Sequence, residues 1–423
     1  MLNYKEAARN FIENEKQFHL GVIPTEQPNP KTKNLSFVIS KDTAQGIKMI
    51  LSADSEIPVV ASKAFETPEF QRLISDIKRA IDERRTVLFS SVGASGRLAL
   101  QLDAAWRYFW TSLIQKLPAR RKEFLEISEV SNSLTTGGDR ALVRSVENFE
   151  DYMTFGAQQI IDAKVGPGDV VVGLAECGLS ASINGSVIEA DKQCCTTYYI
   201  YCNPKEILVN HLERCRMVFE RDNIIKINCF VGNMAIAGST RMQVTTVELL
   251  TVGAAIEVAC GRWLKENLTP EELEVVGVPA LDLQEYVKEF VKLNQALSGG
   301  KALAGLAKAV EYETETYQKN GLITYITHDY LLDILTDTTE RQPTFTLPPF
   351  KKFNDTEAQV SWAYAKDPLY PNTVAWQHVF RRPIKGLDWT VEDYKRLKAS
   401  EAIINNPPKV ASSEVEQYNI GNI

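Results

Sequence analysis

The chain has 423 residues, of which 44% are hydrophobic and 24% charged, and it carries a formal net charge of −7. This composition excludes a fully disordered chain, a collagen and a disulfide-stapled miniprotein, and the length predicts two or three folding units. Asp and Glu outnumber Lys and Arg by 54 to 47, which argues against nucleic acid as a partner because attraction to phosphate backbones depends on positive charge.

Residues 1–80 are expected to form a helical lead-in with one extended polar segment, TEQPNPKTKNLS (25–36). The start of the chain carries charges throughout, and no apolar run approaches the ~20 residues of a membrane span. The seven cysteines include no CxxC pair, and four of them fall inside strand-like runs. We therefore expect reduced structural thiols in a cytoplasmic protein that does not bind a membrane.

Residues 81–265 alternate between strand-like and helix-like segments. The strand candidates are TVLFSSV (86–92), EISEVSNSLT (126–135), GPGDVVVGLA (166–175), CCTTYYIYC (194–202) and IIKINCFV (224–231). Helices are predicted over 97–117, 139–163 and 180–191, the second from apolar residues that recur every three or four positions. Buried strands that alternate with helices indicate an α/β, doubly wound three-layer sandwich with a parallel sheet.

Residues 266–423 are expected to hold a helical linker and a partial second unit. GLITYITHDYLLDILTD (321–337) predicts a strand, a turn and a helix, whereas residues 343–423 are rich in Pro and aromatic residues. About 100 residues after Gly321 are too few for a second complete sandwich. We therefore expect the second unit to be incomplete and the natural chain to continue past Ile423.

Three glycine-containing turns follow predicted strands, where doubly wound sheets bind their ligands. Their backbone amides and hydroxyls suit an anion such as phosphate. A tight structural turn explains each motif equally well by itself, but three such turns on one sheet favour an anion site. The candidate phosphate-binding residues are Gly93, Ser95 and Gly96 in the first turn, Ser180 in the second, and Ser239 and Thr240 in the third.

Few other side chains indicate chemistry. Glu147 lies beside the apolar face of its predicted helix, where a solvated carboxylate is the simplest interpretation. His211 and His328 lack the spacing of a metal site, although His328 lies on a strand-to-helix turn where it could face a ligand. No metal and no cofactor are expected. The aromatic residues at 106 and 108–110 are interpreted as core or interface.

Six segments together resemble a known family. They are residues 25–36, 90–105 (SSVGASGRLALQLDAA), 135–151 (TTGGDRALVRSVENFED), 168–182 (GDVVVGLAECGLSAS), 201–208 (YCNPKEIL) and 237–257 (AGSTRMQVTTVELLTVGAAIE). The order is that of the SIS (sugar isomerase) domain family that contains N-acetylmuramic acid 6-phosphate etherase and the glucokinase regulatory protein. TDTTERQPTF (336–345) is similar to a further family motif and implies the tandem arrangement of the regulatory protein.

The resemblance implies binding of a hexose 6-phosphate or an amino-sugar 6-phosphate, and a sugar kinase as a regulated partner. It also implies an alternative function, a carbon–oxygen lyase that eliminates lactate from N-acetylmuramic acid 6-phosphate with two glutamates. Glu147 matches one of them. Trp106 stands where the other belongs in the first unit, but Glu340 supplies its counterpart in the second, so the resemblance implies Glu147 and Glu340 as catalytic residues of a composite site.

Two further expectations follow from the family. An aldose–ketose isomerase is a third possible function, because it also needs a carboxylate base, but no motif of the family selects it. Because the etherase pairs two chains, we also expect a homodimer.

Glu176 and Cys177 depart from the small residues and serine of the family's second loop. A carboxylate facing a phosphate would weaken binding by about 1–4 kcal/mol, so either the first and third loops hold the ligand or Glu176 points away.

Overall fold

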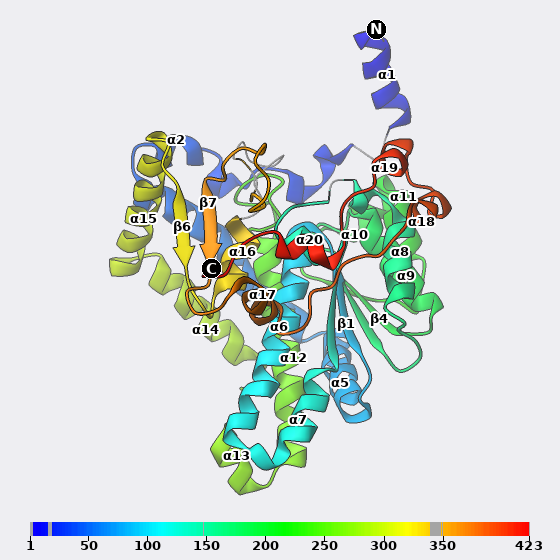
Figure 1. The fold of residues 1–423 in the computed structure, drawn as a ribbon, viewed down its shortest axis with the longest axis vertical. Coiled ribbons are helices and arrows are strands. Elements are labelled where there is room, and N and C mark those ends of the chain that lie inside the picture. The colour runs from blue at the N-terminus through cyan, green and yellow to red at the C-terminus, as the bar shows by residue number, and fades with distance from the viewer. Residues whose placement is uncertain (1–2, 16–18, 147, 339–347, 349, 423) are drawn as a thin grey trace.

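The computed structural model describes residues 3–15, 19–146, 148–338, 348 and 350–422. It contains a parallel sheet covered by helices on both faces, with a long helical arm and a smaller C-terminal unit beside it (Figure 1). The α/β three-layer class is therefore confirmed. The boundaries at residues 80 and 265 stay a prediction.

Five parallel strands form the main sheet in the order β2-β1-β3-β4-β5. They are β1 (Val87–Ser91), β2 (Ser131–Thr135), β3 (Val170–Leu174), β4 (Thr196–Tyr201) and β5 (Ile225–Asn228). The order reverses between β1 and β3, which pair in register from Val87 with Val170. In such sheets the loops beyond the carboxyl ends of the strands at the reversal form the ligand crevice.

Side chains alternate between the two faces of each strand, as a two-residue period requires. Val87 and Phe89 join the large core on one face, whereas Leu88 joins a cluster on the other. The first face is covered by α5 (Pro68–Glu83), α6 (Gly93–Lys116) and α12 (Gln243–Asn267), and the second by α8 (Met153–Asp162) and α9 (Ala181–Lys192). Helices therefore shield both faces of the sheet from solvent, which explains why the strands are almost continuously apolar.

The predicted helix over 139–163 is wrong in its first half. Short 3₁₀ turns at Asp139–Leu142 and Phe149–Asp151 precede α8. Asn148 adopts a left-handed backbone with φ of 65°, which an α-helix cannot contain. The apolar residues of this segment still pack inward. Their spacing therefore predicted correctly which side chains face the core, but not the conformation of the backbone.

The remaining helices surround this sandwich. Before the sheet lie α1 (Tyr4–Asn14), α2 (Leu35–Ile39), α3 (Thr43–Ala53) and α4 (Ile57–Phe65); within or after it lie α7 (Arg121–Ser128), α10 (Lys205–His211), α11 (Glu213–Phe219), α13 (Pro270–Val276), α14 (Leu283–Leu297) and α15 (Gly300–Gln318). By length and composition α12 could cross a membrane, but 67% of its most apolar window is buried inside the protein. It is a core helix that packs against α5 and α6 (Figure 1).

The C-terminal unit contains a second, two-stranded parallel sheet. β6 (Ile323–Ile326) pairs with β7 (Ala363–Lys366), and α16 (Leu331–Thr338) follows β6 as the sequence predicts. The later helices are α17 (Asn372–Phe380), α18 (Val391–Arg396), α19 (Glu401–Asn405) and α20 (Ser412–Glu416). The partial SIS-like character of this unit stays a prediction.

Buried charges join this unit to the sandwich. Arg382 donates from Nη1 and Nη2 to the Asp139 carboxylate at 2.6 and 2.9 Å, and from Nε to Asp103 at 3.1 Å. Burial alone would raise the pKa of Asp103, but the charges of Arg107 and Arg382 outweigh it and lower that pKa. The buried carboxylate is therefore charged and paired.

Candidate functional site

Hydrogen bonds join the loops at the carboxyl edge of the sheet. Ser91 Oγ donates to the backbone oxygen of Leu174 at 2.5 Å, which ties the end of β1 to that of β3. Thr136, just beyond β2, donates from its backbone N–H to Ser91 O and from Oγ1 to Ser182 Oγ at 3.0 Å. The first and second predicted turns thus border one small region.

The first turn is held by its own residues. Gly93 has φ of 58°, a left-handed conformation that favours glycine. Ser95 Oγ donates to Val92 O at 2.6 Å, so this hydroxyl stabilises the start of α6. A Cβ on Gly96 would lie 2.6 Å from Thr135 Cγ2, which explains this glycine by close helix–strand packing. Their binding of phosphate stays a prediction.

The second and third turns present further hydroxyls to the region. Ser180 is the N-cap of α9, but its side chain makes no capping hydrogen bond. In the third turn Ser239 is buried and Thr240 is half-buried, and Thr245 Oγ1 lies 2.7 Å from Thr240 O. All six predicted binding residues therefore lie at the same edge of the sheet, three in the first turn of α6 and three in the loops that precede α9 and α12.

Glu176 points into this region rather than away from it. Its residue is only 3% exposed, and Oε1 accepts a hydrogen bond from Thr245 Oγ1 at 2.5 Å. Burial raises the pKa of Glu176 to about 7, although hydrogen bonds from Thr245 and Thr240 and the charges of Arg241 and Arg97 act in the opposite direction. A carboxyl group thus lies where cations and hydroxyls of the first and third loops converge.

A second buried carboxyl group lies behind the first. Glu248 Oε1 accepts the backbone N–H of Glu176 at 3.0 Å and the thiol of Cys202 at 3.5 Å. Burial and then the charge of Glu176 raise the pKa of Glu248 well above its ordinary value. Ionisation of both groups is therefore disfavoured, because two adjacent buried carboxylates cannot both be charged without a large cost.

The N-terminal polar segment completes the edge. Thr25 is fully buried, its backbone oxygen accepts Gly238 N–H at 3.2 Å, and its Oγ1 accepts from Asn203 Nδ2 at 3.0 Å. Beside it, a Cβ on Gly238 would lie 3.1 Å from Glu26 Oε2, and burial raises the pKa of Glu26. Sequence reasoning overlooked Glu26, although its segment is the first of the six motifs.

Glu147 and Glu340, the expected catalytic pair, lie outside the described residues. Trp106 occupies the position at which the family's other glutamate belongs in the first unit. It is 1% exposed and donates from Nε1 to Ile127 O at 2.9 Å. Trp106 and Trp110 are therefore core residues, whereas Tyr108 is exposed. All seven cysteines are free thiols, but Cys194 is exposed in a turn before β4 rather than inside a strand.

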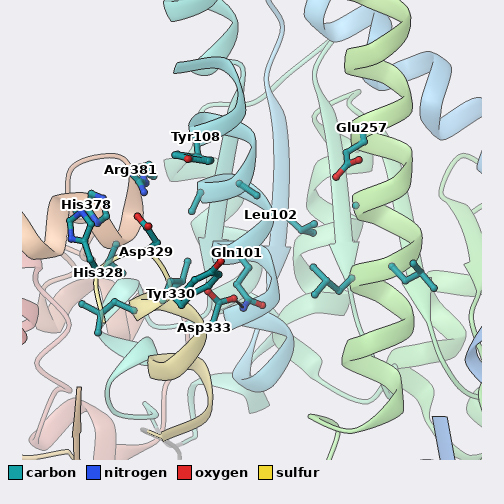
Figure 2. Close-up of a pocket in the computed structure, with 18 of the residues that line it drawn as sticks. Gln101, Leu102, Tyr108, Glu257, His328, Asp329, Tyr330, Asp333, His378 and Arg381 are labelled. Atoms are coloured by element: carbon teal, nitrogen blue, oxygen red, sulfur yellow. Dashed lines mark hydrogen bonds between the residues drawn. The ribbon is translucent and has the colours of Figure 1, made fainter. Parts of the chain in front are cut away.

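A cavity of about 600 Å³ lies elsewhere, between α6, α12 and the C-terminal unit (Figure 2). His328, on the turn after β6, lines it together with His378 from α17. Burial, and then the charge of Arg381, lowers the pKa of His378 to about 4, so this imidazole is neutral at neutral pH. The sequence spacing gave no sign of this pair, because His328 and His378 lie 50 positions apart in the chain and meet only in the folded protein.

Comparison with known proteins agrees with this architecture. The family model of the glucokinase regulatory protein N-terminal SIS domain matches residues 69–190. N-acetylmuramic acid 6-phosphate etherase of Gloeothece citriformis is 30% identical over 251 residues, which cover 56% of this chain and 70% of the relative. The etherases of Synechocystis sp. and Lactobacillus johnsonii are 27% and 25% identical, over 56% and 61% of this chain and 70% and 75% of theirs.

The parallel sheet and the hydroxyl-bearing loops at its carboxyl edge define a SIS-domain protein. The chain belongs to the SIS family of N-acetylmuramic acid 6-phosphate etherase and the glucokinase regulatory protein.

Proposed function

We propose that this protein binds a hexose 6-phosphate or an amino-sugar 6-phosphate at the carboxyl edge of the main sheet and acts as a sensor, like the regulatory protein. Its family membership and the gathered hydroxyls of the loops support this proposal. The observation that carries it is the position of the Glu176 carboxyl group among Thr245, Thr240 and the charges of Arg97 and Arg241. Hydroxyl groups and cations that stabilise a carboxylate can also bind a phosphate, because both are oxyanions.

Glu176 then determines how strongly a phosphate binds. A phosphate dianion at this edge meets the carboxylate unless Glu176 is protonated or turns away. Close like charges cost about 1–4 kcal/mol at the effective dielectric constants of water and protein surfaces. Neutralising Glu176 should therefore strengthen phosphate binding by at least about fivefold.

The test is thermal shift with a titration of fructose 6-phosphate, glucose 6-phosphate and N-acetylmuramic acid 6-phosphate. Wild-type protein is compared with Glu176→Ala and with the control Glu189→Gln, which neutralises a carboxyl near the opposite end of α9. A ligand at 100 times its dissociation constant adds about 2.7 kcal/mol of stability. We expect tighter binding only in Glu176→Ala; no shift in any protein with any sugar phosphate contradicts the proposal.

The etherase activity is the second candidate, and the relatives named N-acetylmuramic acid 6-phosphate etherase favour it. One glutamate would remove the proton beside the masked carbonyl, and the other would protonate the departing lactyl oxygen. Glu147 and Glu340 are the proposed pair. Lactate release from N-acetylmuramic acid 6-phosphate, lost in Glu147→Gln while sugar-phosphate binding persists, would assign the lyase; binding without turnover would favour the sensor.

Three further parts of the proposal depend on the family alone. A sugar kinase is the proposed partner of the sensor, and a homodimer is the proposed assembly if the protein is an etherase. Aldose–ketose isomerisation ranks below both other activities because no residue of the site selects it. Co-purification with a sugar kinase in the presence of fructose 6-phosphate tests the first part, and sedimentation tests the second.

A further inference from the structure

The cavity between the core helices and the C-terminal unit has a polar end. There the imidazoles of His328 and His378 and the carboxylate of Asp329 gather beside Arg381, whereas Glu257 lies across the cavity on α12 (Figure 2). The wall of the cavity between this polar end and Glu257 is largely apolar and includes Leu102 and Ala105. None of these residues is among those predicted to bind the sugar phosphate or to carry out catalysis.

Three side chains at this end offer metal-ligand atoms that lie close together. One ligand atom from each of His328, Asp329 and His378 lies within 4.8 Å of the other two. The turn after β6 supplies the first two residues, and α17 supplies the third. The two imidazole rings stack with centroids 4.1 Å apart and planes at 19°, so their nitrogen atoms are neighbours although no local sequence motif joins them.

A buried carboxylate orients one of the rings. His328 Nδ1 lies 2.8 Å from Asp367 Oδ2, and the Asp367 residue is fully buried. Asp367 Oδ1 in turn accepts the backbone N–H groups of Leu369 at 2.7 Å and Tyr370 at 3.1 Å. A carboxylate that accepts the Nδ1 proton leaves Nε2 with its lone pair for a metal, the arrangement found around metal-bound histidines.

We propose that His328 Nε2, His378 and Asp329 bind one divalent transition-metal ion of the zinc class. Two imidazoles and one carboxylate suit Zn²⁺ and its neighbours, whereas Ca²⁺ and Mg²⁺ prefer oxygen ligands alone. Parallel rings direct their lone pairs side by side rather than at one point, so one ring must turn about its side-chain bonds when the metal binds.

The cavity also defines what the ion would face. Three protein ligands leave a coordination position open, as in zinc sites that bind water or a small ligand. Arg381 lies at the same end, with its guanidinium 4.9 Å from the centre of the Tyr108 ring. A small anion such as a carboxylate or phosphate in the open position would contact both the metal and this cation.

The experiment titrates Zn²⁺ calorimetrically, and Co²⁺ by its visible absorption, into full-length protein without a histidine tag after chelator treatment. The chain has only four histidines, so His211→Ala, at an exposed position of α10, is a close control, and Cys194→Ser tests the exposed thiol. We expect one equivalent bound by wild type and both controls. In His378→Ala and Asp329→Asn the affinity should fall by at least about 100-fold, while far-ultraviolet circular dichroism stays unchanged.

Several results would overturn the proposal. They are the absence of binding to wild type, an unchanged affinity in a folded His378→Ala protein, or loss of the equivalent in His211→Ala or Cys194→Ser. If Asp329→Asn fails to fold, the thermal shift given by Zn²⁺ in wild type and His378→Ala still decides the question. Intense thiolate-to-Co²⁺ absorption would also contradict the assigned ligands, because none of them is a cysteine.

Discussion

At the scale of single residues, Glu176 determines the electrostatics of the candidate site. Burial of the Glu176 carboxyl group is only partly compensated by the hydrogen bonds from Thr245 and Thr240 and by the charges of Arg241 and Arg97, so its pKa stays raised. Its adjacent partner Glu248 adds a like charge when both are ionised. This pair should therefore make the stability of the protein depend on pH.

We predict that Glu176→Gln stabilises the protein above neutral pH. The pKa of Glu176 is raised from 4.5 to about 7, so the folded state holds this proton more tightly than the unfolded state. The contribution is fully present below about pH 4.5 and is lost as the pH rises through about 7. With about 1.4 kcal/mol per pKa unit, the loss is on the order of 3 kcal/mol.

Urea unfolding at about pH 5 and at about pH 8 measures this effect. The difference in unfolding free energy between Glu176→Gln and wild type should move in favour of the variant as the pH rises. The control Glu189→Gln removes a carboxyl group whose pKa is lowered, so its difference should not move in that direction. A difference for Glu176→Gln that is constant between the two pH values would contradict the assigned titration.

At the scale of elements, glycines let α8 and α9 approach closely. A Cβ on Gly156 of α8 would lie 1.7 Å from Ser182 O, and a Cβ on Gly185 of α9 would lie 2.0 Å from Met153 O. Both clashes involve backbone atoms, which cannot move aside as a flexible side chain can. Because Ser182 lies in the first turn of α9, beside the second loop, this contact also fixes part of the candidate site.

We predict that Gly185→Ala destabilises the protein by at least about 1–3 kcal/mol through overpacking. The matched control is Gly305→Ala in α15, where no atom lies within 4 Å of the new Cβ. Alanine is the better helix former by about 1 kcal/mol, so the control should be neutral or more stable. Urea denaturation of both variants measures the difference, and equal stabilities would show that α8 and α9 can separate without cost.

At the scale of the whole molecule, the C-terminal unit is part of the main core. Leu100, Ala104 and Leu142 of the sandwich share a buried cluster with Trp376 and Phe380 of α17. Arg382, two residues beyond the end of α17, pairs with Asp139 of the sandwich. We therefore expect the two parts to unfold together.

We predict that Arg382→Ala destabilises the protein by about 3–5 kcal/mol, because it leaves Asp139 and Asp103 buried without their shared cation. The control Arg396→Ala removes an exposed ion pair with Asp393 and should cost at most about 1 kcal/mol. Urea unfolding followed by tryptophan fluorescence and by circular dichroism measures both. Separate transitions for the two signals in wild type would instead indicate independent units.

The sequence by itself determined the sandwich, the five segments that supply the strands of its main sheet, and the family. Those properties follow from local periodicity and ordered motifs, which a single chain displays directly. Its error over 139–163 has the same origin, since a helical spacing of apolar residues such as Leu142 and Phe149 specifies which side chains are buried but not every backbone angle.

Only the tertiary structure decided the direction of Glu176, the position of Glu26 and the meeting of His328 with His378. Each depends on contacts between residues far apart in the chain, and no local pattern encodes them. Arg382 illustrates the reason most clearly. Its charge is buried only because Asp139 and Asp103, more than 240 positions earlier, are brought to it by the folded sheet and α6.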